Sequence, residues 1–148
     1  MKNNYYVYNN EAIGCCVLMS VLRQSSNMDY ARVFLILPLL LDDKTVSFIS
    51  RDNNFNLIKF LSKESMVYNF NARFLSLLPI TINSLGILFN IKVVKIDVEG
   101  NISLINDNFR DSELSERLKN IEKIIPIFLE ATQPYPTEYL YKALGVQL

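Results

Sequence analysis

The longest apolar run of the chain lies in residues 31–41, where the nine residues after Arg32 carry no polar side chain. A half-buried strand would alternate apolar and polar residues, and an amphipathic helix would show a polar stripe. The run shows neither pattern, so it predicts a helix covered on all sides, either by the core or by a partner. Asp29 is a candidate N-cap for this helix, and Pro38 should kink or divide it. The run is too short for a membrane span, which needs about 20 residues.

Most of the remaining chain shows apolar residues at helical spacing. A first helix should follow Asn9 or Asn10 and end near Arg23, and a polar link should join it to the central run. Asp42 or Asp43 should cap a third helix. Further helices are expected over residues 55–61, 65–79, 82–91 and, after a polar link, in the C-terminal part, 112–145. Pro79 should end one of these helices, and Thr81 and Thr137 should each cap one. Ser112 should begin the long C-terminal helix, and Pro126 should kink or split it.

The spacing of apolar residues changes after residue 91. Residues 92–98 and 102–105 read as two strands around a turn that contains Gly100. Two helices followed by a hairpin predict a winged-helix-like unit over about residues 66–105, with the hairpin as the wing. The expected fold is therefore a single domain, residues 1–148, mainly α with one β-hairpin.

The amino-acid composition lacks residues that catalysis and metal binding commonly use. The 148 residues hold 15 basic and 15 acidic side chains and no histidine, so the commonest general base and metal ligand is missing. The only cysteines, Cys15 and Cys16, are adjacent and fit a buried helix of a reduced protein. The adjacent pair Asp42-Asp43 reads as a helix cap rather than as a catalytic dyad. We therefore expect a protein that is not an enzyme and holds no metal or cofactor. No export signal is visible at Met1–Asn4, so a cytoplasmic protein without a membrane partner is expected.

A winged-helix unit raises DNA as a possible ligand. The helix expected at residues 82–91 would be the recognition helix, yet it carries no positive charge. Lys92 and Lys95 in the wing could neutralise two phosphates at most, which supports only weak, salt-sensitive binding. A scaffold whose apolar helix faces protein fits this charge pattern better. A stand-alone winged-helix DNA-binding regulator is the alternative.

Several stretches, in order along nearly the whole chain, resemble the middle components of ABC three-component systems. The matching stretches are residues 8–14, 34–41, 42–45, 73–81, 96–102 and 144–146. Asn10 departs from the proline of the family pattern, and Asp42-Asp43 stands in place of its histidine. Any role of that histidine therefore cannot be transferred to this chain.

The resemblance implies a cytosolic, non-enzymatic adaptor that couples an SMC-like ABC ATPase to an effector such as a nuclease. Lamassu-type antiphage systems are the nearest named example, and DNA would be contacted weakly or through the complex. Candidate partner contacts lie on exposed helix faces and on the wing. They are Tyr8, Asn9, Asn10, Arg73, Lys92 and Lys95.

Overall fold

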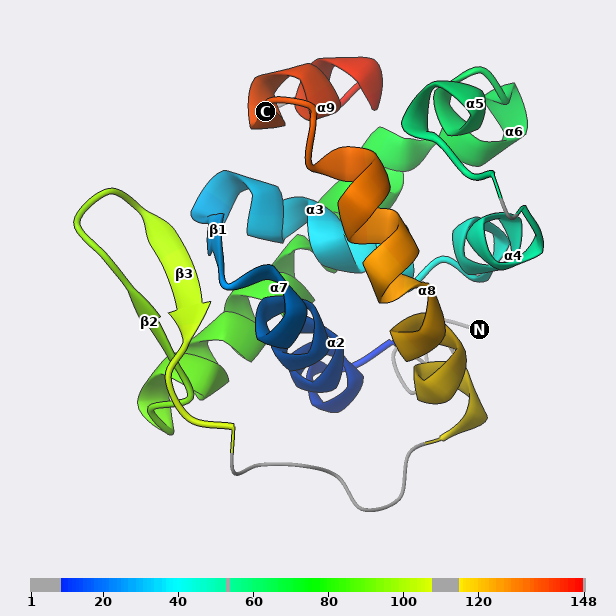
Figure 1. Ribbon diagram of the computed structural model, residues 1–148. Helices are drawn as coiled ribbons and strands as arrows, with labels where there is room; N and C mark the ends of the chain where they lie inside the picture. The colour runs from blue at the N-terminus through cyan, green and yellow to red at the C-terminus, as the bar shows by residue number, and fades with distance from the viewer. Residues whose placement is uncertain (1–8, 53, 108–114, 148) are drawn as a thin grey trace.

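Helices from both halves of the chain enclose one hydrophobic core, and a small sheet lies at one edge (Figure 1). The computed structural model describes residues 9–52, 54–107 and 115–147. The helices are α2 (Glu11–Ser25), α3 (Tyr30–Leu40), α4 (Asp43–Arg51), α5 (Leu57–Leu61), α6 (Glu64–Val67), α7 (Phe70–Asn90), α8 (Glu116–Thr132) and α9 (Thr137–Ala143). The strands are β1 (Asn27–Asp29), β2 (Val94–Ile96) and β3 (Asn101–Leu104).

Helix α3 is the centre of the fold, as its sequence predicts. It packs against α2, α4 and α7, and every residue from Leu35 to Leu41 is buried. The core therefore covers the apolar run, and no partner is needed to explain it. Asp29 accepts a hydrogen bond from the Arg32 backbone N–H at 3.0 Å, which confirms the predicted cap. Pro38 does not divide the helix: it cannot bond the carbonyl of residue 34, but α3 continues to Leu40 because the residues around Pro38 are buried in the core.

The other predicted caps near the N-terminal half are also found. The Asn10 side chain accepts hydrogen bonds from the backbone N–H groups of Ala12 and Ile13, at 3.0 and 3.2 Å. Asp42 caps α4 by accepting from the backbone and the hydroxyl of Thr45, at 3.2 and 2.7 Å. Asp42, rather than Asp43, is thus the cap. These polar groups fix where α2 and α4 begin.

The prediction of separate helices at 65–79 and 82–91 is wrong. The structure has a short α6 and then one helix, α7, which passes through Pro79 without a break. Thr81 is no cap; it is fully buried, and its hydroxyl donates to the Leu77 carbonyl at 3.1 Å. Pro79 lacks the N–H that would bond the carbonyl of residue 75, but both residues lie on the exposed side, where water can replace that bond. The opposite side packs against α2 and α3 along its length, and this burial outweighs the lost bond.

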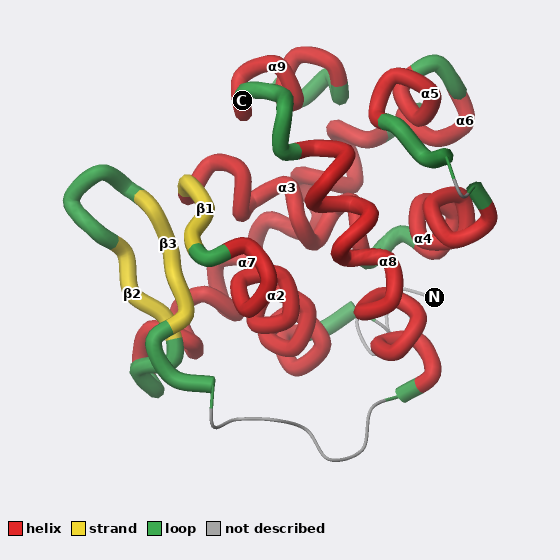
Figure 2. The backbone as a smooth tube through the Cα atoms, viewed as in Figure 1, coloured by secondary structure: helices red, strands yellow, loops and turns green. Residues whose placement is uncertain are grey.

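The predicted hairpin is confirmed as β2 and β3, but the sheet has a third strand that the sequence did not reveal. Residues 27–29, expected within or next to a polar link, form β1 and pair antiparallel with β3, Met28 opposite Ile102. The sheet order is β1-β3-β2 (Figure 2). Helix, strand and helix (α2, β1, α3), followed later by helix and hairpin (α7, β2, β3), are compatible with a winged-helix unit into which α4–α6 are inserted.

The C-terminal helices pack across the N-terminal ones. The predicted start at Ser112 lies outside the described residues, and the described part of α8 begins at Glu116 with Ser115 as its N-cap. Pro126 lies inside α8 without splitting it. Thr137 is the first residue of α9 rather than its cap. Gly145 follows the end of α9 with φ 72°, a left-handed conformation suited to the residue that terminates a helix.

Candidate interaction surfaces

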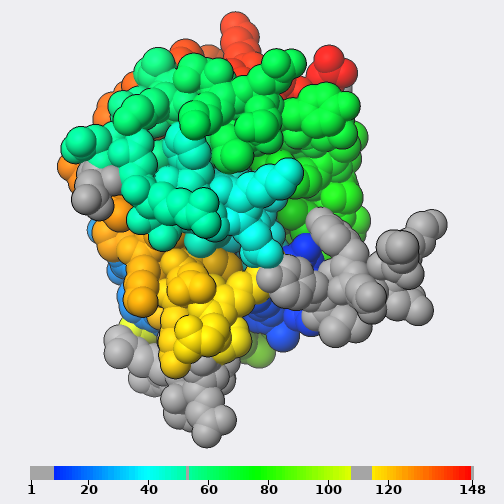
Figure 3. Space-filling model, turned by 90° about the vertical axis from the view of Figure 1, so that its right-hand side faces the viewer, coloured from blue at the N-terminus to red at the C-terminus, as the bar shows by residue number. Residues whose placement is uncertain are grey.

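The asparagines proposed as partner contacts serve the fold through their polar groups. Asn9 is 3% exposed, and its side-chain oxygen accepts a hydrogen bond from Arg117 Nη2 at 2.8 Å. Arg117 Nη2 also donates to the Leu41 carbonyl at 2.9 Å, and its Nε lies 3.5 Å from Asp43 Oδ1. Arg117 thus joins α8 to α4 and to the end of α3; α4 and α8 lie side by side on the face shown in Figure 3. Tyr8 lies outside the described residues.

Arg73 of α7 is partly buried and fastens α7 to the end of α3. Its Nε donates to the Pro38 carbonyl at 3.3 Å, and Nη1 lies 3.7 Å from Asp42 Oδ2. The guanidinium also stacks on the Phe70 ring, 5.1 Å from its centroid. Nη2 is buried and, within the described part of the chain, has no hydrogen-bond partner. Arg73 therefore holds two helices together and presents only an edge, 24% of its side chain, to solvent.

The wing, β2 and β3 with the turn between them, is the most exposed of the predicted contact regions. Lys92 and Lys95 are exposed, as expected. The turn is closed by Asp97, whose carboxylate accepts from the backbone N–H groups of Glu99 and Asn101, both at 2.9 Å. Gly100 adopts φ 87°, which few other residues tolerate. This ordered turn leaves the Val98 side chain fully exposed, at 104% of its reference area.

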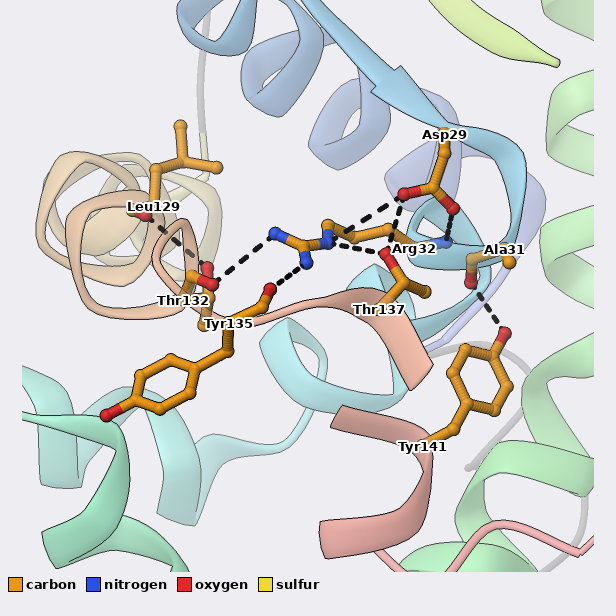
Figure 4. A network of polar contacts seen from close by, with 8 residues as sticks. All are labelled: Asp29, Ala31, Arg32, Leu129, Thr132, Tyr135, Thr137 and Tyr141. Atoms are coloured by element: carbon orange, nitrogen blue, oxygen red, sulfur yellow. Dashed lines mark hydrogen bonds and ion pairs between the residues drawn. The ribbon is translucent and has the colours of Figure 1, made fainter. Parts of the chain in front are cut away.

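A polar network around Arg32 joins α3 to the C-terminal helices (Figure 4). Arg32 Nε donates to the Thr137 hydroxyl at 3.0 Å, and its Nη groups donate to the carbonyls of Thr132 and Tyr135. Thr137 in turn donates to Asp29 at 2.6 Å. Burial lowers the pKa of the Arg32 guanidinium, while the Asp29 carboxylate opposes that shift.

Tyr141 also connects α9 to the start of α3, independently of Arg32. Its hydroxyl donates to the Ala31 carbonyl at 2.5 Å, and burial raises its pKa to about 12. Together with Arg32 it fixes α9 against the start of α3. The sequence offered one signal for this network: Arg32 is the only charged residue at the head of the apolar run.

Little of the described chain resembles a catalytic or metal centre. Among residues 9–52, 54–107 and 115–147, no group of three or more His, Cys, Asp or Glu side chains could hold a metal ion. Cys15 donates to the Ser84 carbonyl at 3.6 Å, and burial raises the pKa of its thiol. A raised pKa keeps the thiol protonated and poorly nucleophilic at neutral pH.

The outer side of α7 is unusually apolar. Leu75, Ile82 and Ile87 expose 48, 52 and 43% of their surface, and residues 74–91 contain no charged side chain. The stretch Glu64–Asn90 is long and apolar enough to cross a membrane by length and composition alone, and 39% of its most apolar window is buried inside the protein. The inner side of α7 packs on α2 and α3, as a core helix does. Its outer side is therefore a candidate surface for contact with protein.

Comparison with known proteins assigns the chain to a family. No curated protein and no solved structure shows a significant match. One family model matches residues 1–148, the whole chain, and it describes Middle Component 3 of the ABC-three component (ABC-3C) systems. This match confirms the resemblance found in the sequence. The chain belongs to the Middle Component 3 family of ABC-three component systems.

Proposed function

We propose that this protein is a non-catalytic adaptor that links an SMC-like ABC ATPase to an effector, such as a nuclease, in a cytoplasmic antiphage or anti-plasmid complex of the Lamassu kind. The observation that carries the proposal is membership of a middle-component family over the whole chain. A middle component works within a multi-protein ABC-3C system. The chain needs no metal or cofactor for this role, since it acts by binding.

The wing is the part of the molecule best suited to contact the ATPase or the effector. Its turn is held by Asp97 and Gly100, so Val98 is presented at low entropic cost. Ile96 on β2 is 50% exposed and adds apolar surface, and the exposed side chains of Lys92 and Lys95 add charge to this part of the molecule. An apolar centre with charged side chains around it is the usual composition of a protein interface.

The other proposed contacts have smaller accessible parts. Arg73 presents one edge, and Asn9 and Asn10 lie where α2 begins, with Tyr8 directly before them in the chain. We propose that a partner reaches this region through Arg73 and through the residues that precede α2. The wing is the primary contact.

Charge favours protein over DNA as the direct ligand. In a DNA-binding winged-helix protein the helix before the wing carries Arg, Lys, Asn or Gln to the bases. Here residues 74–91 have no charge, and Asn83 and Asn90 are the exposed amides. With only two lysines at the wing, contact with DNA would be weak or would pass through the assembled complex.

Co-expression tests the proposal. The chain is produced with the ATPase and the effector encoded beside it, and the tagged ATPase is purified. We expect the wild-type chain to co-purify, and Val98→Asp to reduce the recovered amount about tenfold or more, because a charge would be buried in an apolar contact. Ile58→Asp, a change at a residue of α5 that is 53% exposed, is the matched control and should co-purify normally.

Two results would count against this account. Absence of the wild-type chain from the purified ATPase would refute the adaptor role, and normal recovery of Val98→Asp would refute only the role of the wing. A mobility shift of duplex DNA by the isolated chain at physiological salt, lost in Lys92→Glu with Lys95→Glu, would instead support the DNA-binding alternative.

A further inference from the structure

The outer side of α7 carries an apolar seam with the spacing of a coiled coil. Its residues follow one another at alternating intervals of three and four, the pattern that keeps side chains on one line of a helix. The seam consists of Ala72, Leu75, Pro79, Ile82, Gly86 and Phe89. The first four are exposed, and the last two are partly exposed. From Ala72 to Ile82 the seam is exposed and uncovered within the described chain, whereas Phe89 at its end also packs partly against the core.

Gly86 leaves room for a close approach to this seam. Glycine in a helix interior lowers stability relative to alanine, so it usually has a steric reason. Gly14 has such a reason, because a Cβ there would lie 2.4 Å from Ser84 Oγ. A Cβ at Gly86 would meet no atom within 4 Å. The described chain therefore does not require glycine at position 86, whereas a second backbone packed against the seam would.

Large and small residues alternate along the seam in a way that makes it complementary to itself. Leucine, isoleucine and phenylalanine occupy one set of positions, and alanine, proline and glycine occupy the other. In an antiparallel helix pair the two sets face each other, so each large side chain meets a small one. About a two-fold axis between residues 80 and 81, the opposed pairs are Leu75 with Gly86, Ile82 with Pro79, and Phe89 with Ala72.

We propose that the seam is a homodimer interface, in which α7 packs antiparallel against α7 of a second copy of this chain. Charge supports a second copy over a different partner. In helix pairs, charged residues beside the seam choose the partner and exclude self-pairing. Here the residues beside the seam on one side are Ser76, Asn83 and Asn90, all neutral. Two copies therefore meet without repulsion.

The size of the seam sets the strength of the dimer. Ala72 to Phe89 spans 17 residue steps, roughly 26 Å at about 1.5 Å per residue. A single helix pair of this length buries less than the roughly 800 Å² per partner of a standard stable complex. We therefore expect a weak dimer that dissociates at micromolar concentrations and assembles when the chain is concentrated or held in a larger complex.

Sedimentation of the full chain over low to high micromolar concentrations tests this inference. The wild type should shift from monomer to dimer. Ile82→Asp should weaken the dimer about tenfold or more, because two carboxylates would meet an apolar contact near the two-fold axis. Ile58→Asp, which places the same charge on α5, should dimerise as the wild type does.

Gly86→Ala gives a test that does not depend on a destabilised variant. The added methyl group should stabilise the α7 helix and raise the melting temperature of the dilute monomer, while it fills the space that Leu75 of the second copy needs and weakens the dimer. A wild-type monomer at all concentrations would overturn the inference. So would a dimer that Ile82→Asp and Gly86→Ala leave unchanged, or one that Ile58→Asp disrupts equally.

Discussion

Helices α2 and α7 approach each other closely, and this contact determines which side of α7 faces outward. One substitution tests the contact directly. Gly14 of α2 is buried against Ser84 of α7. In Gly14→Ala the new Cβ would lie 2.4 Å from Ser84 Oγ and 3.3 Å from Leu37 Cδ1. The first distance is shorter than any normal contact, so the serine or the helices must move.

The magnitude follows from comparison with Gly86, the other glycine within a helix. Replacing glycine by alanine in a helix interior contributes about 0.8–1.0 kcal/mol of stability at either position. At Gly86 nothing opposes that gain, because the new Cβ has no neighbour within 4 Å. At Gly14 overpacking costs about 1–3 kcal/mol. The propensity term cancels in the comparison, so Gly14→Ala should be about 1–3 kcal/mol less stable than Gly86→Ala.

Ser84→Ala identifies the atom responsible. Once the hydroxyl is removed, the nearest atom of residue 84 is its Cβ, 3.4 Å from the added methyl group, which is an ordinary contact. Gly14→Ala should therefore cost about 1 kcal/mol less in the Ser84→Ala background than alone. Ser84→Ala also removes the hydrogen bond from the hydroxyl to the Glu11 carbonyl, at 3.4 Å. This bond is lost whether Ser84→Ala is made in the wild type or in Gly14→Ala, so its loss cancels in the comparison.

Urea denaturation of the four variants and the wild type measures these differences, at concentrations low enough to keep the chain monomeric. If Gly14→Ala and Gly86→Ala were equally stable within about 0.3 kcal/mol, the close approach of α2 and α7 would be refuted.

Three further predictions concern the polar contacts. Asp42→Ala should lower the free energy of unfolding by about 1–2 kcal/mol, because it removes a helix cap, whereas Asp43→Ala, whose side chain is 64% exposed, should cost less in the same urea titration. Arg32→Met should cost about 1–3 kcal/mol, since it leaves the carbonyl of Thr132 without its donor; calorimetry measures this loss. Tyr141 has a pKa raised from 10.0 to about 12, so its stabilising effect is complete below pH 10 and is lost as the pH rises toward 12. Tyr141→Phe should remove that part of the alkaline loss of stability, and an unchanged pH profile would refute the assignment.

Local sequence signals were sufficient for much of the fold. Asn10, Asp29 and Asp42 each cap a helix through a bond to a residue two or three positions later, so the local sequence contains both partners. The hairpin likewise follows from alternation on each side of Gly100. These elements were predicted because their determinants are close in the chain.

The predictions failed where residues far away in the sequence determine the local structure. Pro79 ends a helix by local rules, yet the inner side of α7 is packed against α2 and α3, and this burial keeps the helix continuous. Strand β1 has three residues and exists because it pairs with β3, more than seventy residues later. The partners of Arg32 lie about a hundred residues away, so no local pattern could show that this charge is satisfied internally.

The candidate contact residues differ in how much of their surroundings the local sequence reveals. Lys92 and Lys95 are exposed, as the hairpin pattern suggested. Asn9 and Arg73 carry polar groups that also suit a surface, but Arg117 and Pro38 occupy them. Neither of these partners is near in sequence.

The most direct test of the adaptor role is recovery of this chain with the ABC ATPase. Cells that express the ATPase, this chain and the effector are lysed, and the complex is purified through a tag on the ATPase. The account predicts that all three proteins elute together, and that deletion of this chain releases the effector from the ATPase. Co-elution of ATPase and effector in equal amounts without this chain would contradict it.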